Sequence, residues 1–184
     1  KKRWVIGIVL KKKKKKKKKI LNIVLKRLKK KKKKKEKKKN KNILKKIKKK
    51  KCKKFLISDG DIFGAISTAI KKFNIDLYIG TGGAPEGVLA ASILKSLEGQ
   101  MHCRLVFKDK IQKKRALKMG IKNLKKKYQI KDLIKNDAIF VATGVTNGYL
   151  LNGIKKNKKK FTTHSLIVTT KSKKIKFVKS EFKI

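Results

Sequence analysis

Proline, cysteine and acidic residues are scarce in this chain of 184 residues. With one proline, two cysteines and 12 scattered glycines, it is neither collagen-like nor a small scaffold held together by disulfides. The two thiols, neither of them in a CxxC pair, fit a protein of the reducing cytoplasm. No apolar run approaches the roughly 18–20 residues of a membrane-spanning helix, so we expect no membrane span.

Acidic residues are so few that the net charge is extreme. There are 60 Lys or Arg residues and 10 Asp or Glu residues, which gives a net charge of +50. Residues 1–54 hold 33 bases against one acid, a net charge of +32, and residues 55–184 hold 27 bases against nine acids, a net charge of +18. We therefore expect two parts: a Lys-rich, low-complexity segment over 1–54 that retains one strand (4–10), and an α/β part over 55–184.

The lysine runs bear on possible partners. Runs such as Lys11–Lys19 and Lys29–Lys35 usually stay solvated, and they bind nucleic acids or anionic surfaces through counterion release whatever the protein does. They lack the interleaved aromatic residues of many nucleic-acid-binding segments. Abundant Lys, Ile and Asn also indicate an A/T-rich codon bias. We therefore expect only non-specific nucleic-acid binding, and a polybasic nucleic-acid or anionic-surface binder stays open as one alternative function.

Apolar patterning predicts alternating strands and helices. Short β-branched runs favour strands at 55–58, 76–79, 101–107, 138–143, 163–170 and 173–179. Helical spacing favours helices at 20–28, 62–73, 85–97, 111–119 and 130–134. This alternation is typical of an α/β protein whose sheet is covered on both faces by helices.

Glycine-bearing turns follow three of these strands, at Asp59-Gly-Asp61, Gly80-Thr-Gly-Gly83 and Thr143-Gly144. Ligands of open α/β sheets bind beyond the carboxyl ends of the strands, where glycine allows close approach and positive φ. The turn at Gly80-Thr-Gly-Gly83 leads into a helix N-terminus, which favours phosphate. A purely structural turn is the alternative.

Three of the ten acids, Asp59, Asp61 and Glu86, lie beside these turns. Clustered carboxylates suit a hard cation or sugar hydroxyls. The alternative is that an aspartate caps the following helix and that Glu86 interacts favourably with its helix dipole.

Two histidines invite a catalytic interpretation that the sequence does not favour. His164 precedes Ser165, but strand neighbours point to opposite faces and no Gly-x-Ser-x-Gly elbow is present. We expect His164 to be a buried or supporting residue that makes hydrogen bonds. His102 and Cys103 should likewise face opposite ways, which makes them a poor pair of metal ligands.

The motifs occur in one order along the chain. They are Ile57-Ser-Asp-Gly-Asp61, then Ile79-Gly-Thr-Gly-Gly-Ala-Pro-Glu-Gly-Val-Leu-Ala-Ala91, then Ala142-Thr-Gly-Val-Thr146, then Thr162-Thr-His-Ser-Leu166. With this set, residues 55–184 resemble the C-terminal portion of the class II (GlpX-type) fructose-1,6-bisphosphatases. Trp4–Leu10 also resembles the family strand that precedes the Asp-Gly-Asp unit.

The resemblance implies part of a layered α/β sandwich of the lithium-sensitive sugar-phosphatase superfamily, here its C-terminal half. It implies metal-dependent hydrolysis of a sugar bisphosphate, fructose 1,6-bisphosphate to fructose 6-phosphate, in gluconeogenesis, with Mg²⁺ or Mn²⁺. By position, Glu86 matches a metal-ligating glutamate and Gly83 a substrate-contacting backbone position. The family's sugar-contacting turn matches Asp59, Gly60 and Asp61.

The chain departs from the family pattern in its first part. The family's other metal carboxylates and its Asp-Pro motif belong to an N-terminal half that nothing here matches, since the one proline is Pro85. Its substrate-binding Arg-Pro-Arg falls on Lys12-Lys13-Lys14, and lysine lacks the bidentate fork of arginine.

One glutamate cannot hold a pair of catalytic metal ions. We therefore expect the polypeptide alone to be inactive, as a fragment or a degenerate copy. Its expected partners are further copies of itself in a homo-oligomer or a missing N-terminal half. An inactive sugar-phosphate-binding or oligomerisation module is the other alternative.

Overall fold

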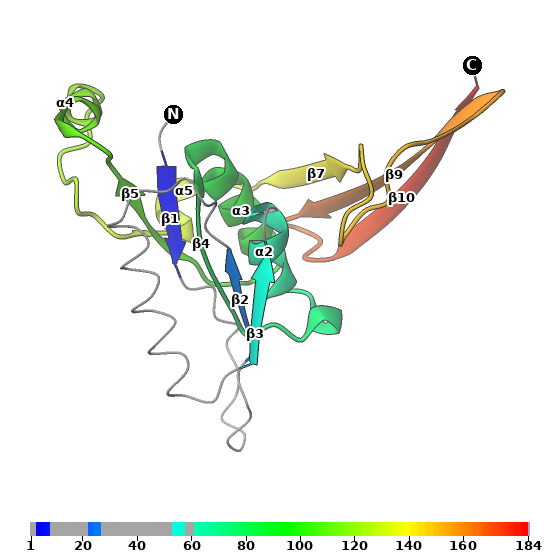
Figure 1. Ribbon diagram of the computed structural model, residues 1–184, viewed down its shortest axis with the longest axis horizontal. Coiled ribbons are helices and arrows are strands. Elements are labelled where there is room, and N and C mark those ends of the chain that lie inside the picture. The colour runs from blue at the N-terminus through cyan, green and yellow to red at the C-terminus, as the bar shows by residue number, and fades with distance from the viewer. Residues whose placement is uncertain (1–2, 8–21, 27–52, 58–60, 184) are drawn as a thin grey trace.

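The computed structural model describes residues 3–7, 22–26, 53–57 and 61–183 (Figure 1). Its strands are β1 (Arg3–Gly7), β2 (Asn22–Lys26), β3 (Lys53–Ile57), β4 (Leu77–Gly83), β5 (His102–Val106), β6 (Tyr128–Gln129), β7 (Ile139–Thr143), β8 (Lys155–Asn157), β9 (Lys160–Thr169) and β10 (Ile175–Lys183). Its helices are α2 (Asp61–Ser67), α3 (Ala84–Ser96), α4 (Lys110–Lys118), α5 (Ile130–Leu133) and the 3₁₀ turn η1 (Lys71–Phe73). The expected mixed α/β fold is confirmed, and no helix in the described part is long and apolar enough to cross a membrane.

The first six strands form one mixed sheet in the order β3-β2-β4-β1-β5-β6. Strand β2 pairs in parallel with both β3 and β4, whereas β1 is antiparallel to β4 and β5. Because β3 and β4 run in the same direction on either side of β2, their carboxyl ends lie at the same edge of the sheet. In the sequence the predicted Asp59–Asp61 unit follows β3 at this edge, and Gly80–Gly83 forms the last four residues of β4.

Helix α2 packs against β4 through a buried tyrosine. Tyr78 is completely buried, and a Cβ atom added to Gly64 of α2 would lie 2.4 Å from its ring atom Cε2. A Cβ atom on Gly80, two residues further along β4, would lie 2.1 Å from its hydroxyl oxygen. Both glycines are therefore required by the volume of the Tyr78 ring.

Helix α3 joins the first sheet to the second and lies between them in Figure 1. It contacts β1 and β4 on one side and β7 and β9 on the other. Its buried face combines small with large residues, which lets the helix approach both sheets closely. That face includes Ala90, Ala91, Ile93 and Leu94, all fully buried.

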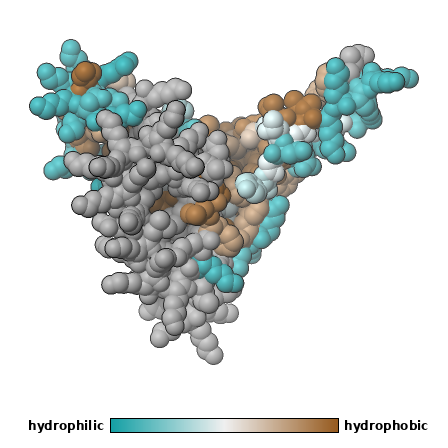
Figure 2. Space-filling model, viewed as in Figure 1, coloured by the Kyte–Doolittle hydropathy of each residue, from teal (hydrophilic) through white to brown (hydrophobic). Residues whose placement is uncertain are grey.

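The second sheet has the order β10-β9-β7, with β8 also pairing with β9. Its antiparallel register places Phe140 and Ile175 on either side of Val168. Phe140, Leu166 and Val168 are buried in the core. The opposite face is open: Ile139, Val141, Val178 and Phe182 are 71, 58, 37 and 56% exposed. The end of this sheet projects as an arm along which hydrophobic residues are visible (Figure 2).

Two predicted helices are wrong in whole or in part. The helix predicted at 20–28 is replaced over Asn22–Lys26 by the central strand β2, and three consecutive apolar residues, 23–25, suit a strand with neighbours on both sides. The helix predicted at 62–73 ends at Ser67. There the hydroxyls of Ser67 and Thr68 donate to the carbonyls of Gly64 and Ala65, at 2.8 and 2.7 Å, and compete with continued helical pairing.

Candidate functional site

The predicted Gly80–Gly83 turn is instead a strand. Strand β4 continues through Gly83, its last four residues pair with Arg3–Ile6 of β1, and α3 begins at Ala84. Gly83 has an extended backbone (φ −68°, ψ 160°), and among the described glycines only Gly120 has positive φ. The expected need for positive φ is therefore wrong here. The glycines serve close packing, as the Tyr78 contact shows for Gly80.

Glu86 lies in the first turn of α3 and is exposed. Its carboxylate oxygen Oε2 accepts the N–H of Gly83, so the side chain folds back over the end of β4. This interaction belongs to a capping box, and Pro85 occupies the first turn as predicted. A Cβ atom on Gly83 would come within 3.0 Å of the same oxygen, so glycine there makes room for the cap. A cap is thus the one role that the geometry gives Glu86.

The other predicted substrate residues are only partly described. Asp59 and Gly60 lie outside the described residues, and Asp61 is the first residue of α2. At the end of β3, Ile57 pairs with Lys26 of β2. The preceding residue of β2, Leu25, pairs with Ile79 of β4. The end of β3 therefore lies level with the middle of β4, which continues four residues further, from Gly80 to Gly83. The third predicted turn, Thr143-Gly144, follows β7 in the other sheet.

The described residues do not by themselves fit a divalent metal ion. No three His, Cys, Asp or Glu side chains within this part of the chain lie close enough together to hold one. Glu86 offers a single carboxylate, and one of its oxygens already accepts the Gly83 N–H. Mg²⁺ prefers a full octahedral shell of oxygen ligands, which one carboxylate cannot supply.

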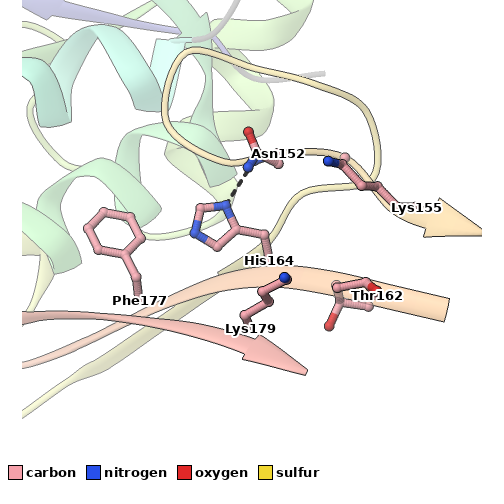
Figure 3. Close-up of a pocket in the computed structure, with 8 residues that line it drawn as sticks. Asn152, Lys155, Thr162, His164, Phe177 and Lys179 are labelled. Carbon is pink, nitrogen blue, oxygen red and sulfur yellow. Dashed lines mark hydrogen bonds between the residues drawn. The ribbon is translucent and has the colours of Figure 1, made fainter. Parts of the chain in front are cut away.

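His164 of β9 is held by the loop between β7 and β8. Its Nδ1 atom accepts the backbone N–H of Asn152 at 3.0 Å (Figure 3). In the same loop, Asn147 accepts the N–H of Gly153 at 2.9 Å. The loop folds tightly because a Cβ atom on Gly144 would lie 2.1 Å from the Asn152 carbonyl oxygen. The prediction that His164 is a hydrogen-bonding residue is confirmed.

His102 and Cys103, at the start of β5, face opposite sides of the sheet, as predicted. His102 is exposed, whereas Cys103 is only 4% exposed. Burial, and secondarily the charge of Asp132, raise the pKa of the Cys103 thiol from 9.0 to about 12. At neutral pH the thiol is protonated and unreactive.

Sequence reasoning missed a pocket beside His164. It has a volume of about 270 Å³ and is lined by Asn152, Gly153, Lys155, Thr162, Thr163, His164, Phe177 and Lys179 (Figure 3). Its residues come from a loop and three strands, β8, β9 and β10. Thr162, Thr163 and His164 belong to the quoted Thr162-Thr-His-Ser-Leu166 motif, but only the strand register brings the other lining residues to them.

These features define a mixed α/β protein with a glycine-rich strand that runs into a glutamate-capped helix. The chain matches the family "Bacterial fructose-1,6-bisphosphatase, glpX-encoded" over residues 4–182, and it belongs to that family. The resemblance seen in the sequence motifs is thereby confirmed.

Curated relatives agree with this assignment. Over 142 residues the chain is 32% identical to "Fructose-1,6-bisphosphatase class 2" of Haemophilus influenzae, which covers 70% of this chain and 42% of the relative. Over 140 residues it is 34% identical to "Fructose-1,6-bisphosphatase 1 class 2" of Escherichia coli K12, which covers 68% of this chain and 41% of the relative. The chain therefore spans about two fifths of the length of the curated relatives it matches.

Proposed function

We propose that this chain contributes the C-terminal part of a class II fructose-1,6-bisphosphatase. The reaction is hydrolysis of fructose 1,6-bisphosphate to fructose 6-phosphate and phosphate, in the cytoplasm, within the layered sandwich of the lithium-sensitive sugar-phosphatases. The proposal rests on membership of the family and on the names of the curated relatives. The divalent metal of this proposal is Mg²⁺ or Mn²⁺.

The single structural observation that carries the proposal is the junction of β4 and α3. The family-like Gly-Gly-Ala-Pro-Glu-Gly segment brings the backbone of Gly83 and the carboxylate of Glu86 into direct contact at one edge of the sheet. In the proposal, Gly83 binds the sugar bisphosphate together with Asp59, Gly60 and Asp61. Glu86 supplies one ligand of the metal site.

The rest of the metal site has to come from elsewhere, because the described residues offer no group of three ligands. We propose that a further copy of the chain or a segment matching the N-terminal half of the family supplies the other carboxylates. The chain alone then holds no catalytic metal ion and hydrolyses nothing.

Co-expression tests this proposal. The chain is produced together with the part of the H. influenzae relative that lies outside the match, and the co-purified complex is assayed for phosphate release from fructose 1,6-bisphosphate with Mn²⁺. We expect metal-dependent hydrolysis that Glu86→Gln abolishes. The control Glu98→Gln, which changes an exposed acid two residues after the end of α3, should leave the hydrolysis unchanged. A co-purified complex that is inactive, or equally active with Glu86→Gln, contradicts the proposal.

A second candidate is an inactive sugar-phosphate-binding module, which the capping role of Glu86 favours, since the carboxylate already has a structural function. This alternative predicts that the same complex binds fructose 1,6-bisphosphate in calorimetry and releases no phosphate.

A further inference from the structure

The pocket beside His164 is built from one face of the second sheet. Lys155 of β8 lies opposite Thr162 of β9, and Lys179 of β10 lies opposite His164. Directly opposed residues of antiparallel strands project from the same face. Two ammonium groups, a hydroxyl and an imidazole therefore share this face, and all four side chains line the pocket.

The pocket has one apolar wall. Phe177 lies two residues before Lys179 on the same face of β10, and its ring centroid is 5.6 Å from that of His164. The ammonium group of Lys72, from η1, lies 5.9 Å from the centroid of the Phe177 ring. A third positive charge thus lies next to the wall of the pocket.

Some hydrogen-bond donors of the pocket are already paired within the protein, and others can serve a ligand. The backbone N–H groups of Asn152 and Gly153 are already used by His164 and Asn147. Because Nδ1 of His164 accepts a hydrogen bond, the neutral imidazole carries its proton on Nε2, which is a donor. Among the ion pairs of the described residues none includes Lys155 or Lys179.

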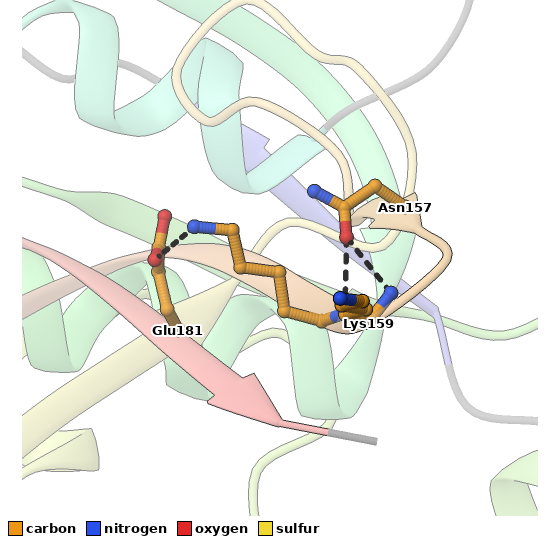
Figure 4. A network of polar contacts seen from close by, with 4 residues as sticks. Asn157, Lys159 and Glu181 are labelled. Atoms are coloured by element: carbon orange, nitrogen blue, oxygen red, sulfur yellow. Dashed lines mark hydrogen bonds and ion pairs between the residues drawn. The ribbon is translucent and has the colours of Figure 1, made fainter.

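One acid shares this face of the sheet, and it has a closer partner. Glu181 lies opposite Thr162, and its carboxylate is paired with Lys160 at 2.7 Å (Figure 4). Lys160 in turn follows a tight turn in which Asn157 accepts the N–H groups of Lys159 and Lys160 at 3.2 and 3.0 Å. Lys160 is the main partner of the Glu181 carboxylate, and the charge of Lys179 and the Thr162 hydroxyl also interact with it and help to lower its pKa.

We propose that this pocket binds the phosphate group of a small anion, either inorganic phosphate or a phosphate monoester. Neighbouring ammonium groups repel each other, and an anion between them removes that repulsion. A tetrahedral phosphate accepts charge-assisted hydrogen bonds from several directions, which suits Lys155, Lys179 and Nε2 of His164. The volume of about 270 Å³ admits a phosphate with a short carbon skeleton against Phe177. The pocket shares no residue with the Gly83–Glu86 segment.

Nuclear magnetic resonance on the full ¹⁵N-labelled chain provides the test. Inorganic phosphate and glycerol 3-phosphate are titrated separately at constant ionic strength, with chloride as the reference ion. We expect saturating shifts at the amides of Gly153, Thr163, His164 and Lys179. The tighter of the two ligands shows whether a free ion or a monoester is preferred. Shifts that do not saturate, or that chloride reproduces, would overturn the proposal.

Charge-matched variants separate this pocket from the general positive charge of the chain. Lys155→Gln/Lys179→Gln removes the two pocket lysines, and Lys171→Gln/Lys176→Gln removes two exposed lysines outside it, Lys176 being on the opposite face of β10. We expect the first pair to weaken phosphate binding at least tenfold and the second less than twofold. Equal weakening by both pairs contradicts the proposal. If the Lys155→Gln/Lys179→Gln variant fails to fold, the proposal is judged by the chemical-shift changes of the unmodified chain alone.

Discussion

At the scale of single residues, the Tyr78 ring leaves no room for a side chain at Gly64. The ring is completely buried between α2 and β4, against Gly64. Alanine in a helix is intrinsically better than glycine by up to about 1 kcal/mol, but overpacking a buried ring costs roughly 1–3 kcal/mol. With a Cβ atom only 2.4 Å from the ring, the steric term should dominate.

We expect Gly64→Ala to lower the free energy of unfolding by about 2 kcal/mol, measured by urea denaturation. The control is Gly148→Ala, where the new Cβ atom would lie 3.7 Å from its nearest neighbour, the Leu151 carbonyl oxygen. That substitution should change stability by less than about 0.5 kcal/mol. Equal effects of the two substitutions would show that the Tyr78 contact does not constrain Gly64.

Glu86 permits a test that isolates its structural role. Glu86→Ala removes the acceptor for the Gly83 N–H and should cost about 1 kcal/mol of stability, whereas Glu86→Gln retains an acceptor oxygen and should cost less than about half of that. Thermal unfolding of the two variants measures the difference. If both lose the same stability, the charge near the helix dipole stabilises α3 and the hydrogen bond does not.

Cys103 gives a prediction about pH. With a pKa raised to about 12, its thiolate at pH 8 is about a thousandfold rarer than that of a thiol at 9.0. In native chains at pH 8 we expect Ellman's reagent to modify at most one of the two thiols, and to modify both after denaturation. Because the folded pKa is the higher one, the stabilisation is present below pH 9 and is lost as the pH rises toward 12. Fast modification of both thiols in the native chain would contradict the burial of Cys103.

At the scale of elements, strand pairing decides what sequence periodicity leaves open. The strands β5, β7 and β9 and the helices α3, α4 and α5 lie close to their predicted positions. The segment 20–28 was ambiguous because a short apolar run fits a helix face as well as a central strand, and pairing on both sides of β2 resolved it. The pocket beside His164 was missed although three of its residues belong to the Thr162-Thr-His-Ser-Leu166 motif, because its other residues reach them only through the register of three strands.

The open face of the second sheet exposes apolar side chains, which should lower the solubility of the chain. Ile139 and Val141 of β7 lie on its open face, 71 and 58% exposed, so Ile139→Thr/Val141→Thr should keep the strand and change stability by less than about 0.5 kcal/mol. We expect less aggregation in dynamic light scattering, since apolar area is removed from the surface. The matched control, Val168→Thr on the buried face, should instead destabilise the fold by roughly 1–3 kcal/mol. Unfolding caused by the surface pair would show that this face is packed against other residues.

At the scale of the whole molecule, the sixty basic residues say less about function than the few acids. The family match runs from residue 4 to residue 182, a range that includes the Lys-rich segment. The match identifies the family but spans about two fifths of the curated relatives' length. The described residues contain no cluster of carboxylates that could hold a catalytic metal pair. Membership of the family therefore does not by itself make this chain active.

The claim that the chain alone lacks a complete metal site is tested most directly by an activity assay. The assay measures phosphate release from fructose 1,6-bisphosphate by the purified chain of 184 residues, with Mg²⁺ and with Mn²⁺. We expect no release above that of buffer with either metal, because Glu86 alone cannot assemble the metal site. Metal-dependent release by the chain alone, lost with Glu86→Gln, would contradict the claim.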